Sequence, residues 1–284
     1  MRIFLTGANG FIGSAVASAL IADGHSVRGL VRDEEKAALV KARGIEPIIG
    51  SLDDSALLER EAHRADGVVN AADSDHQGAA EALIAGLAGT GNALVHTSGS
   101  SVISDEAMGE PSERIFYEDT PINPLPEKVA RVAIDRLVLD APSVRSAVLC
   151  NTMIYGKGAF AKQAGSGAPL VYIGRGLNRW SNAHIDDVAA LYVLAVKAAP
   201  AGSFMYVESG EAALGDVVKS LAKRLGVDEA QSLPADRAIA LLGREIAVFG
   251  LGSNSRVRGT LATKTLGWMP KHHSIIDWIE KMAG

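Results

Sequence analysis

The sequence of 284 residues is poor in cysteine and in aromatic side chains: it has one cysteine, Cys150, and 5% aromatics. A single cysteine cannot close an internal disulfide, so nothing points to an oxidising compartment, and we expect a cytoplasmic protein. Long apolar runs are also lacking. The longest, from Val188 to Val196, has nine residues, whereas roughly 20 are needed to span a bilayer. The apolar run at the N-terminus is too short for a signal-peptide core. We therefore expect no membrane partner.

An excess of positive charge is lacking too, since 28 Lys and Arg against 33 Asp and Glu leave a net charge of −5. A protein that binds nucleic acid usually carries a basic face, so we expect no such partner. No two of the seven histidines lie three to five residues apart, so the usual spacing of zinc ligands is absent and no metal is expected. What remains is a protein with a small-molecule substrate, as a monomer or homodimer.

The first half of the chain alternates between short apolar runs typical of β-strands and segments with helical spacing. This alternation predicts an α/β fold with right-handed βαβ units and a parallel sheet covered on both faces. Strands are expected at residues 2–6, 26–31, 46–49, 67–70, 93–97 and 146–150. Helices are expected at residues 11–22, 34–42, 55–62, 77–87 and 128–139.

After Cys150 the alternation weakens, which predicts a smaller, mostly helical C-terminal lobe. Residues 156–176 are typical of a glycine-rich loop with a short helix, and helices are expected at 184–197, 213–225, 235–249 and 274–282. A strand is expected at 203–207. We expect a nucleotide-binding domain of residues 1–151 with 181–208, and a substrate-binding lobe of residues 152–180 with 209–284. A cleft between two lobes is a usual place for a small-molecule site.

Three glycines, Gly7, Gly10 and Gly13, stand between the first expected strand and the first expected helix. The first allows a tight turn, the second lets a pyrophosphate approach the backbone, and the third lets the helix pack close to the strand. Phosphates then bind free N–H groups at the positive end of the helix. The pattern predicts a Rossmann-type dinucleotide site on a doubly wound parallel sheet.

The motif from Thr6 to Gly13 resembles the nucleotide fingerprint of the short-chain dehydrogenase/reductase superfamily, in its extended or atypical branch of epimerase- and dehydratase-like proteins. The resemblance covers essentially the whole chain and continues through residues 50–53, 69–72, 97–101, 154–158, 184–189 and 266–270. It implies that Leu52 and Asp53 lie against adenine, and Ala71 and Ala72 beside the phosphates and ribose. With the fingerprint and the second strand, the expected cofactor-binding residues are Thr6, Gly7, Asn9, Gly10, Phe11, Ile12, Gly13, Arg32, Leu52, Asp53, Ala71, Ala72, Thr97, Ser98 and Arg131.

The second expected strand ends at Val31, followed by Arg32 and Asp33. An acidic residue at the strand end would bind the ribose 2′-hydroxyl of NAD, whereas an arginine accommodates a 2′-phosphate. By resemblance to the family, Val31 stands at the position of this acidic residue and Arg32 follows it, so we predict NADP(H) in preference to NAD(H). Asp33 either reaches the ribose or caps the next helix.

The superfamily's usual catalytic pair, a tyrosine four residues before a lysine, is absent. The residues four positions after the five tyrosines are Pro121, Ala159, Gly176, Val196 and Gly210. By resemblance Glu127 stands at the tyrosine position and Arg131 at the lysine position, where the two would also suit an ordinary i,i+4 ion pair. The remaining candidates for proton transfer or carbonyl polarisation are Ser100, Ser101, Tyr155 and His184. For His184 a structural hydrogen bond at the following turn is the alternative.

Three functions from different classes follow. The first is an NADP(H)-dependent oxidoreductase acting on a small carbonyl or alcohol with atypical catalytic residues. The second is a non-catalytic regulatory protein that binds NADP(H). The third is a sugar-nucleotide epimerase or dehydratase, which the motif Cys150-Asn151-Thr152 disfavours because relatives often carry arginine there.

Overall fold

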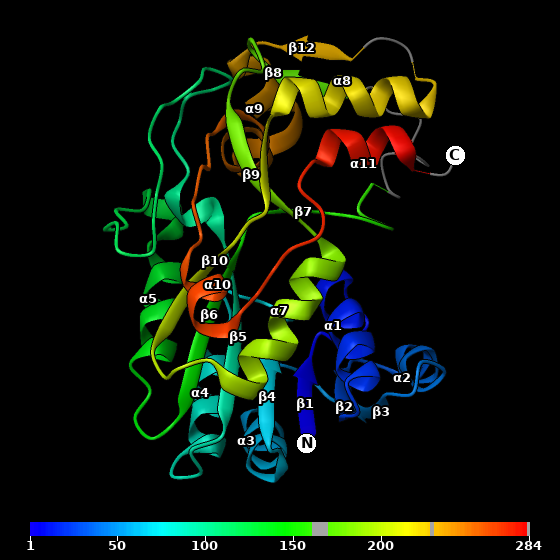
Figure 1. The fold of residues 1–284 in the computed structure, drawn as a ribbon, viewed down its shortest axis with the longest axis vertical. Helices are drawn as coiled ribbons and strands as arrows, with labels where there is room; N and C mark the ends of the chain where they lie inside the picture. The colour runs from blue at the N-terminus through cyan, green and yellow to red at the C-terminus, as the bar shows by residue number, and fades with distance from the viewer. Residues whose placement is uncertain (161–169, 228–229, 283–284) are drawn as a thin grey trace.

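A seven-stranded sheet in the order β10-β6-β5-β4-β1-β2-β3 forms the centre of the molecule. The computed structural model describes residues 1–160, 170–227 and 230–282 (Figure 1). All neighbouring strands of this sheet are parallel. The strands are β1 (Arg2–Thr6), β2 (Ser26–Val31), β3 (Glu46–Ile49), β4 (Gly67–Asn70), β5 (Ala93–Gly99), β6 (Arg145–Asn151) and β10 (Ser203–Val207). The predicted Rossmann-type α/β fold is confirmed.

Helices cover both faces of this sheet, because its central strands are apolar on both sides. One face carries α1 (Phe11–Ala22), α2 (Glu34–Lys41) and α7 (Ile185–Ala198), whose apolar residues share one buried core with the sheet. The other face carries α3 (Ser55–Arg64), α4 (Gln77–Leu87) and α5 (Val129–Leu139) around a second core. The result is the three-layer arrangement of a doubly wound fold.

The C-terminal lobe contains two small sheets as well as helices. Its strands are β7 (Met153–Tyr155), β8 (Val171–Ile173), β9 (Arg179–His184), β11 (Gly210–Ala213) and β12 (Gln231–Leu233). They pair as a three-stranded sheet, β11-β9-β7, and a two-stranded sheet, β12-β8. The helices are α8 (Leu214–Leu225), α9 (Ala235–Arg244), α10 (Leu261–Leu266) and α11 (Ile275–Lys281).

The single helix expected over residues 235–249 is wrong. Gly243 has φ 78° and ψ 158°, so helical geometry ends there, and a π-helical segment follows at Glu245–Gly252. The apolar spacing continues across Gly243, and only the backbone geometry reveals the break. Of the loop and short helix expected over residues 156–176, residues 161–169 lie outside the described part of the chain.

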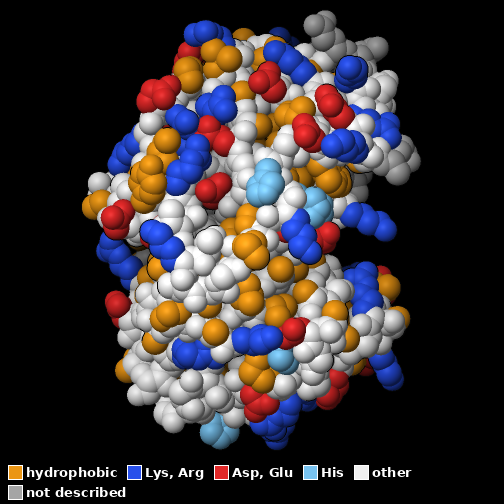
Figure 2. Space-filling model, viewed as in Figure 1, with side chains coloured by type: hydrophobic (Ala, Val, Ile, Leu, Met, Phe, Trp, Pro, Cys, Tyr) orange, Lys and Arg blue, Asp and Glu red, His pale blue; other side chains and the backbone are white. Residues whose placement is uncertain are grey.

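The segment 181–208 contributes to both sheets: α7 and β10 pack with the large sheet, whereas β9 pairs with β7 and β11 in the three-stranded one. Among the described residues, no helix is long and apolar enough to cross a membrane. On the face shown in Figure 2, basic and acidic side chains are interspersed over both lobes.

Candidate functional site

A groove crosses the carboxyl edge of the large sheet between β1 and β4, where the strand order reverses. Such a switch point is the usual ligand site of a doubly wound sheet. One cavity of about 360 Å³ lies on the β2 side, and another of about 640 Å³ lies toward β7. The two share Gly10, Ala71 and Ala72 in their walls. Asn9 lines the first cavity, and Phe11 and Ile12 line the second, so the fingerprint runs along the groove.

The glycines of the fingerprint are required by close backbone approach. Gly7 has φ +72°, and a Cβ on it would lie 2.5 Å from the carbonyl oxygen of Ala71. A Cβ on Gly13 would lie 2.1 Å from the carbonyl oxygen of Gly7. Gly10 is the N-cap of α1 and supplies no capping side chain. The first amides of α1 therefore have no partner within their own helix and suit an anionic group in the groove.

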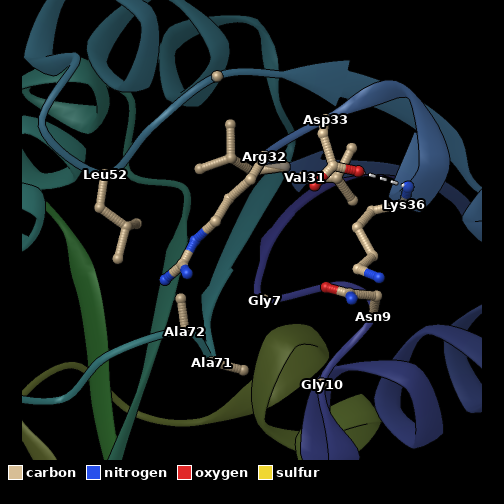
Figure 3. A pocket seen from close by; sticks show the side chains of 12 residues that line it. Gly7, Asn9, Gly10, Val31, Arg32, Asp33, Lys36, Leu52, Ala71 and Ala72 are labelled. Carbon is tan, nitrogen blue, oxygen red and sulfur yellow. Dashed lines mark hydrogen bonds between the residues drawn. The ribbon is translucent and has the colours of Figure 1, made fainter.

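The end of the groove beside β2 carries two basic side chains. Arg32 reaches across the pocket toward Ala72, and Lys36 extends from the first turn of α2 toward Asn9 (Figure 3). The Asp33 carboxylate accepts the backbone N–H of Lys36 at 2.8 Å and caps α2. Of the two roles considered for Asp33, the structure therefore supports the helix cap.

The two residues expected against adenine differ in position. Leu52 lines the cavity beside Arg32. The Asp53 carboxylate accepts hydrogen bonds from Ser51 Oγ at 2.9 Å and contacts His76 Nε2 at 3.1 Å. Its side chain is 85% exposed and lines a neighbouring cavity with His76. Leu52 is thus the one of the two that faces the groove.

Thr6, Thr97 and Ser98 are buried rather than exposed to the groove. Thr6 Oγ1 donates to Asn70 Oδ1 at 2.6 Å and accepts the backbone N–H of Ala71, which fixes the end of β4. The Thr97 hydroxyl forms a hydrogen bond of 2.8 Å with the Tyr192 hydroxyl. The Ser98 hydroxyl donates to a buried carboxylate at 2.7 Å. These three hydroxyls therefore make hydrogen bonds inside the protein and do not face the groove.

Behind the groove lies a buried chain of polar side chains ending at Asp135. Asn70 Nδ2 contacts His96 Nδ1 at 3.1 Å, and since Asn70 Oδ1 already accepts from Thr6, its amide donates to the imidazole. His96 Nε2 then carries the proton and faces Asp135 Oδ1 at 3.8 Å. Burial raises the pKa of Asp135 to about 6 and lowers the pKa of His96 to about 4.

Arg131 lies at the carboxyl end of β5, where resemblance places the lysine. Its Nε donates to Asp75 Oδ1 at 2.7 Å, its Nη2 also contacts Asp75, and its Nη1 approaches Ser101 Oγ at 3.4 Å. Glu127 instead accepts from Arg244 Nε at 2.6 Å, which lowers the pKa of its carboxyl. The i,i+4 pair considered for Glu127 and Arg131 does not form, because each has a partner elsewhere.

The two candidate serines are also separated. Ser100 is buried, and its hydroxyl bonds to Ser255 Oγ at 2.8 Å inside the protein. Ser101 is half-buried, and its hydroxyl faces Arg131. Of the two, Ser101 has the better access to a ligand at this edge of the sheet.

Tyr155 and His184 belong to an aromatic cluster in the C-terminal lobe. Tyr155 is fully buried, which raises the pKa of its phenol to about 12. His184 caps α7 by accepting the N–H of Asp186 at 3.3 Å, the structural role considered from the sequence. Its ring stacks on His272 with centroids 3.8 Å apart.

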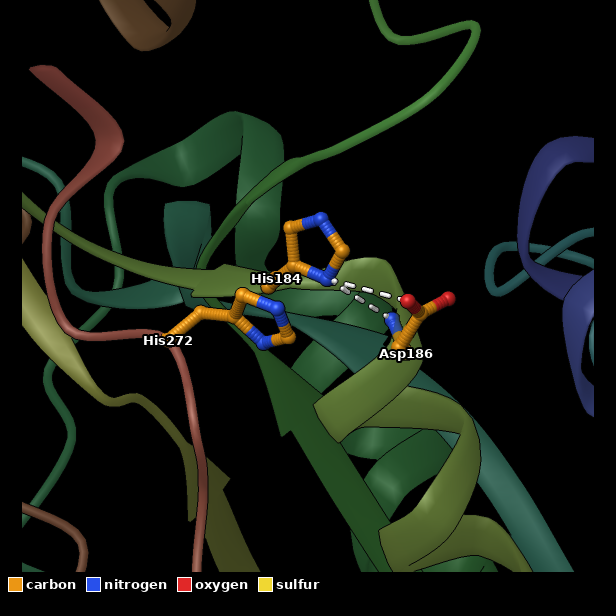
Figure 4. A group of neighbouring side chains, drawn as sticks. All are labelled: His184, Asp186 and His272. Carbon is orange, nitrogen blue, oxygen red and sulfur yellow. Dashed lines mark hydrogen bonds and ion pairs between the residues drawn. The ribbon is translucent and has the colours of Figure 1, made fainter. Parts of the chain in front are cut away.

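His184, Asp186 and His272 form a group that sequence spacing does not reveal (Figure 4). Their potential ligand atoms lie within 4.8 Å of one another. The two imidazole planes are only 24° apart, however. Lone pairs in nearly parallel planes do not converge on one ion, so this geometry favours packing over metal binding.

Motif reasoning missed Lys36, Asp75 and a cluster of arginines. Lys36 lies in the first turn of α2 and Arg32 before its N-cap, so helical spacing does not link the two, and only the folded chain shows that they line one cavity. Asp75 is 56 residues from Arg131, so no local pattern links them. Three arginines of the C-terminal lobe donate to the Glu211 carboxylate: Arg179, Arg256 and Arg258. Glu211 thereby neutralises part of their charge.

The doubly wound sheet and its glycine-lined groove define a Rossmann-type protein with a dinucleotide-binding crevice. The model of the NAD dependent epimerase/dehydratase family matches residues 3–206, and the chain belongs to this family. Members of this family bind a nicotinamide dinucleotide.

The alignments with relatives cover most of the chain. A Schizosaccharomyces pombe protein described only as uncharacterized is 32% identical over 300 residues, covering 97% of each chain. A 4-hydroxy-2-methyl-3-oxo-4-farnesyl-3,4-dihydroquinoline-1-oxide ketoreductase of Stigmatella aurantiaca is 29% identical, covering 87% of this chain and 80% of its own. The structure of a dTDP-glucose 4,6-dehydratase from Streptomyces venezuelae with NAD shares the fold, with a TM-score of 0.78, 20% identity, and coverage of 99% and 95%.

Proposed function

We propose that the protein is an NADP(H)-dependent oxidoreductase that acts on a small carbonyl or alcohol. The groove would hold the dinucleotide along the fingerprint, with the pyrophosphate at the start of α1. When bound, the cofactor supplies the hydride chemistry, while the protein orients and polarises the substrate. The ketoreductase among the relatives supports this class of reaction.

The observation that carries the preference for NADP(H) is the pairing of Arg32 and Lys36 in one cavity. Two cations suit a 2′-phosphate, and the planar guanidinium of Arg32 offers two donors to it. The acidic residue nearby, Asp33, has its carboxylate engaged in capping α2. These features support a site in which basic groups stand where an NAD site has its ribose-binding carboxylate.

Arg131 and Ser101 are the groups best placed to polarise a substrate oxygen. The Arg131 guanidinium directs Nη1 toward Ser101, and a Cβ on Gly99 would lie 3.6 Å from this nitrogen. A cation and a hydroxyl side by side stabilise negative charge that develops on a carbonyl oxygen. Since arginine stays protonated, the proton would come from water, either directly or through the Ser101 hydroxyl, which takes a proton from water as it gives its own to the product oxygen.

Arg32→Ala tests the proposed function directly. We expect NADPH to bind about tenfold more weakly, with NADH affinity almost unchanged, because only NADPH has the 2′-phosphate. Arg43→Ala, in the exposed turn after α2, is the matched control and leaves both affinities unchanged. The rate of NADPH oxidation by the unaltered chain is then measured with a panel of carbonyl substrates. Equal effects of Arg32→Ala on the two cofactors contradict the proposed selectivity.

A second candidate is a regulatory protein that binds NADP(H) without turnover. The burial of Tyr155 and the absence of a tyrosine–lysine pair favour it. It predicts tight binding of NADPH with no substrate-dependent oxidation above background. Robust turnover with any member of the carbonyl panel eliminates this candidate.

A further inference from the structure

The ion pair between Asp75 and Arg131 controls which part of the guanidinium is offered at the sheet edge. Asp75 comes from the loop between β4 and α4, and Arg131 from the first turn of α5. The carboxylate engages Nε and Nη2, so two of the three guanidinium nitrogens are occupied. The third, Nη1, points to Ser101 and Gly99 at the end of β5. Asp75 thus orients Arg131.

The same pair is also nearly neutral as a unit. The hydrogen bond from Arg131 lowers the pKa of the Asp75 carboxyl, so it is ionised at neutral pH. The Arg131 side chain is only 18% exposed, which limits how far water screens its charge. Asp135, one turn further along α5, is buried and accepts a hydrogen bond from Ser98. Asp135 and Glu245 add weaker negative charge near Arg131, so Asp75 is its main but not its sole counter-charge.

A nicotinamide ring carries a positive charge when oxidised and none when reduced. An arginine without a counter-charge near this ring would therefore disfavour the oxidised cofactor relative to the reduced one. A neutral pair of arginine and aspartate has little preference between the two. The charge of Asp75 thus matters at the step where the cofactor changes its own charge.

We propose that Asp75 sets the balance between oxidised and reduced cofactor by neutralising and orienting Arg131. This inference rests on the proposed function, because it requires the nicotinamide half of the cofactor to lie along the β4–β5 edge. Asp75 is a specificity-determining and positioning residue in this view. It acts through Arg131, and no motif of the fingerprint includes it.

The experiment compares dissociation constants for NADP⁺ and NADPH, measured by calorimetry on the full chain and on Asp75→Asn. Asn is nearly isosteric and removes only the charge, so we expect the ratio Kd(NADP⁺)/Kd(NADPH) to rise on the order of fivefold. Higher salt should reduce this change. Asp119→Asn, an exposed aspartate distant in sequence, is the control with the same loss of charge and an unchanged ratio.

Arg131→Met is the second variant, and it should change the ratio Kd(NADP⁺)/Kd(NADPH) in the opposite direction. It leaves the Asp75 carboxylate without its cation, so the ratio should fall below that of the unaltered chain. An unchanged ratio in Asp75→Asn, or equal weakening of both cofactors, overturns the inference while leaving the proposed function in place. Failure of the unaltered chain to bind either cofactor overturns the proposed function as well.

Discussion

At the scale of single residues, Asp33 is an acidic side chain beside the proposed 2′-phosphate site whose carboxylate caps a helix. Its carboxylate caps α2 by accepting the N–H of Lys36, while Arg32 and Lys36 extend into the cavity. The cap stabilises the helix that carries Lys36, yet its charge opposes an anionic ligand. Capping and charge can be separated, because serine also caps helices well.

Asp33→Ser should therefore bind NADPH several-fold more tightly, with stability lowered by less than about 0.5 kcal/mol. Asp33→Ala removes the cap as well and should cost about 1 kcal/mol in the free energy of unfolding. Fluorescence titration with NADPH and urea denaturation measure the two effects. Weaker binding of NADPH to Asp33→Ser would show that the carboxylate contacts the ligand after all.

The buried pair of His96 and Asp135 predicts a pH dependence that is hidden in the unaltered protein. The Asp135 pKa rises from its usual 3.8 to about 6, so its stabilising contribution is present at low pH and lost as pH rises through 6. The His96 pKa falls from 6.5 to about 4, so the unfolded chain binds this proton more readily and stability is lost as pH falls below 6.5. Between pH 4 and 6 the two slopes oppose each other.

Single substitutions should separate the two contributions to the pH dependence of the free energy of unfolding. Asp135→Asn should gain stability from pH 4 to 6.5, and His96→Gln should lose it from pH 4 to 6, each by on the order of 1–3 kcal/mol. Urea denaturation at a series of pH values measures both. Parallel pH profiles of the two variants would contradict the opposing contributions.

At the scale of elements, the turn from β1 into α1 depends on backbone contact that no other residue permits. Gly13→Ala places a methyl group 2.1 Å from the carbonyl oxygen of Gly7, so α1 must move away from the loop. We expect cofactor affinity to fall at least tenfold, because the amides at the start of α1 shift with it. Calorimetric titration with NADPH measures this loss.

Gly78→Ala is the matched control for this substitution. Gly78 lies in α4, and a Cβ there meets only the His76 side chain at ordinary contact distance, 3.7 Å. Alanine favours a helix over glycine by roughly 1 kcal/mol, so this variant should be slightly more stable with unchanged NADPH affinity. Normal cofactor binding by Gly13→Ala would contradict the role given to the tight turn.

Strands of the large sheet follow closely from the sequence, whereas those of the C-terminal lobe do not. The run from Ala93 is apolar and buried on both sides, which predicts a central parallel strand. By contrast, β9 buries Ser181 and Asn182, whose polar character gives no strand signal. Its position depends on pairing with β11 and on the segment near Ser255, which only the folded chain brings together.

The site shows the same division. Arg32 and the glycines are local signals in the sequence, and in the structure they line or shape the groove. The partners of Arg131 and Glu127 are Asp75 and Arg244, which are far away in the sequence. Sequence therefore predicts some of the charged groups at the sheet edge, such as Arg32, but neither Lys36 nor the Asp75 carboxylate that pairs with Arg131.

At the scale of the whole molecule, ion pairs join the 3-10 turn Pro126–Lys128, just before α5, to the C-terminal lobe. Glu127 and Glu106 both accept hydrogen bonds from Arg244 at the end of α9. Beside them, Lys128 pairs with Glu245, and its ammonium lies 4.6 Å from the centre of the Phe249 ring. Lys128 is buried, whereas Arg244 is 47% exposed.

This difference predicts unequal effects on stability. Lys128→Ala should lower the free energy of unfolding by about 1–3 kcal/mol, because it removes a buried side chain and its ammonium over the Phe249 ring. Arg244→Ala should cost less than about 1 kcal/mol, since exposed ion pairs contribute little. Urea denaturation of both variants tests the order, and a larger loss for Arg244→Ala would reverse the assignment.

We propose a dinucleotide groove in which Arg32 and Lys36, which line one cavity, select the 2′-phosphate of NADP(H). The most direct measurement is the pair of dissociation constants of the unaltered protein for NADPH and NADH, obtained by titration at one ionic strength. We predict that NADPH binds at least about tenfold more tightly, because its 2′-phosphate forms a charge-assisted hydrogen bond that NADH cannot form. Equal affinities, or tighter binding of NADH, would contradict the claim.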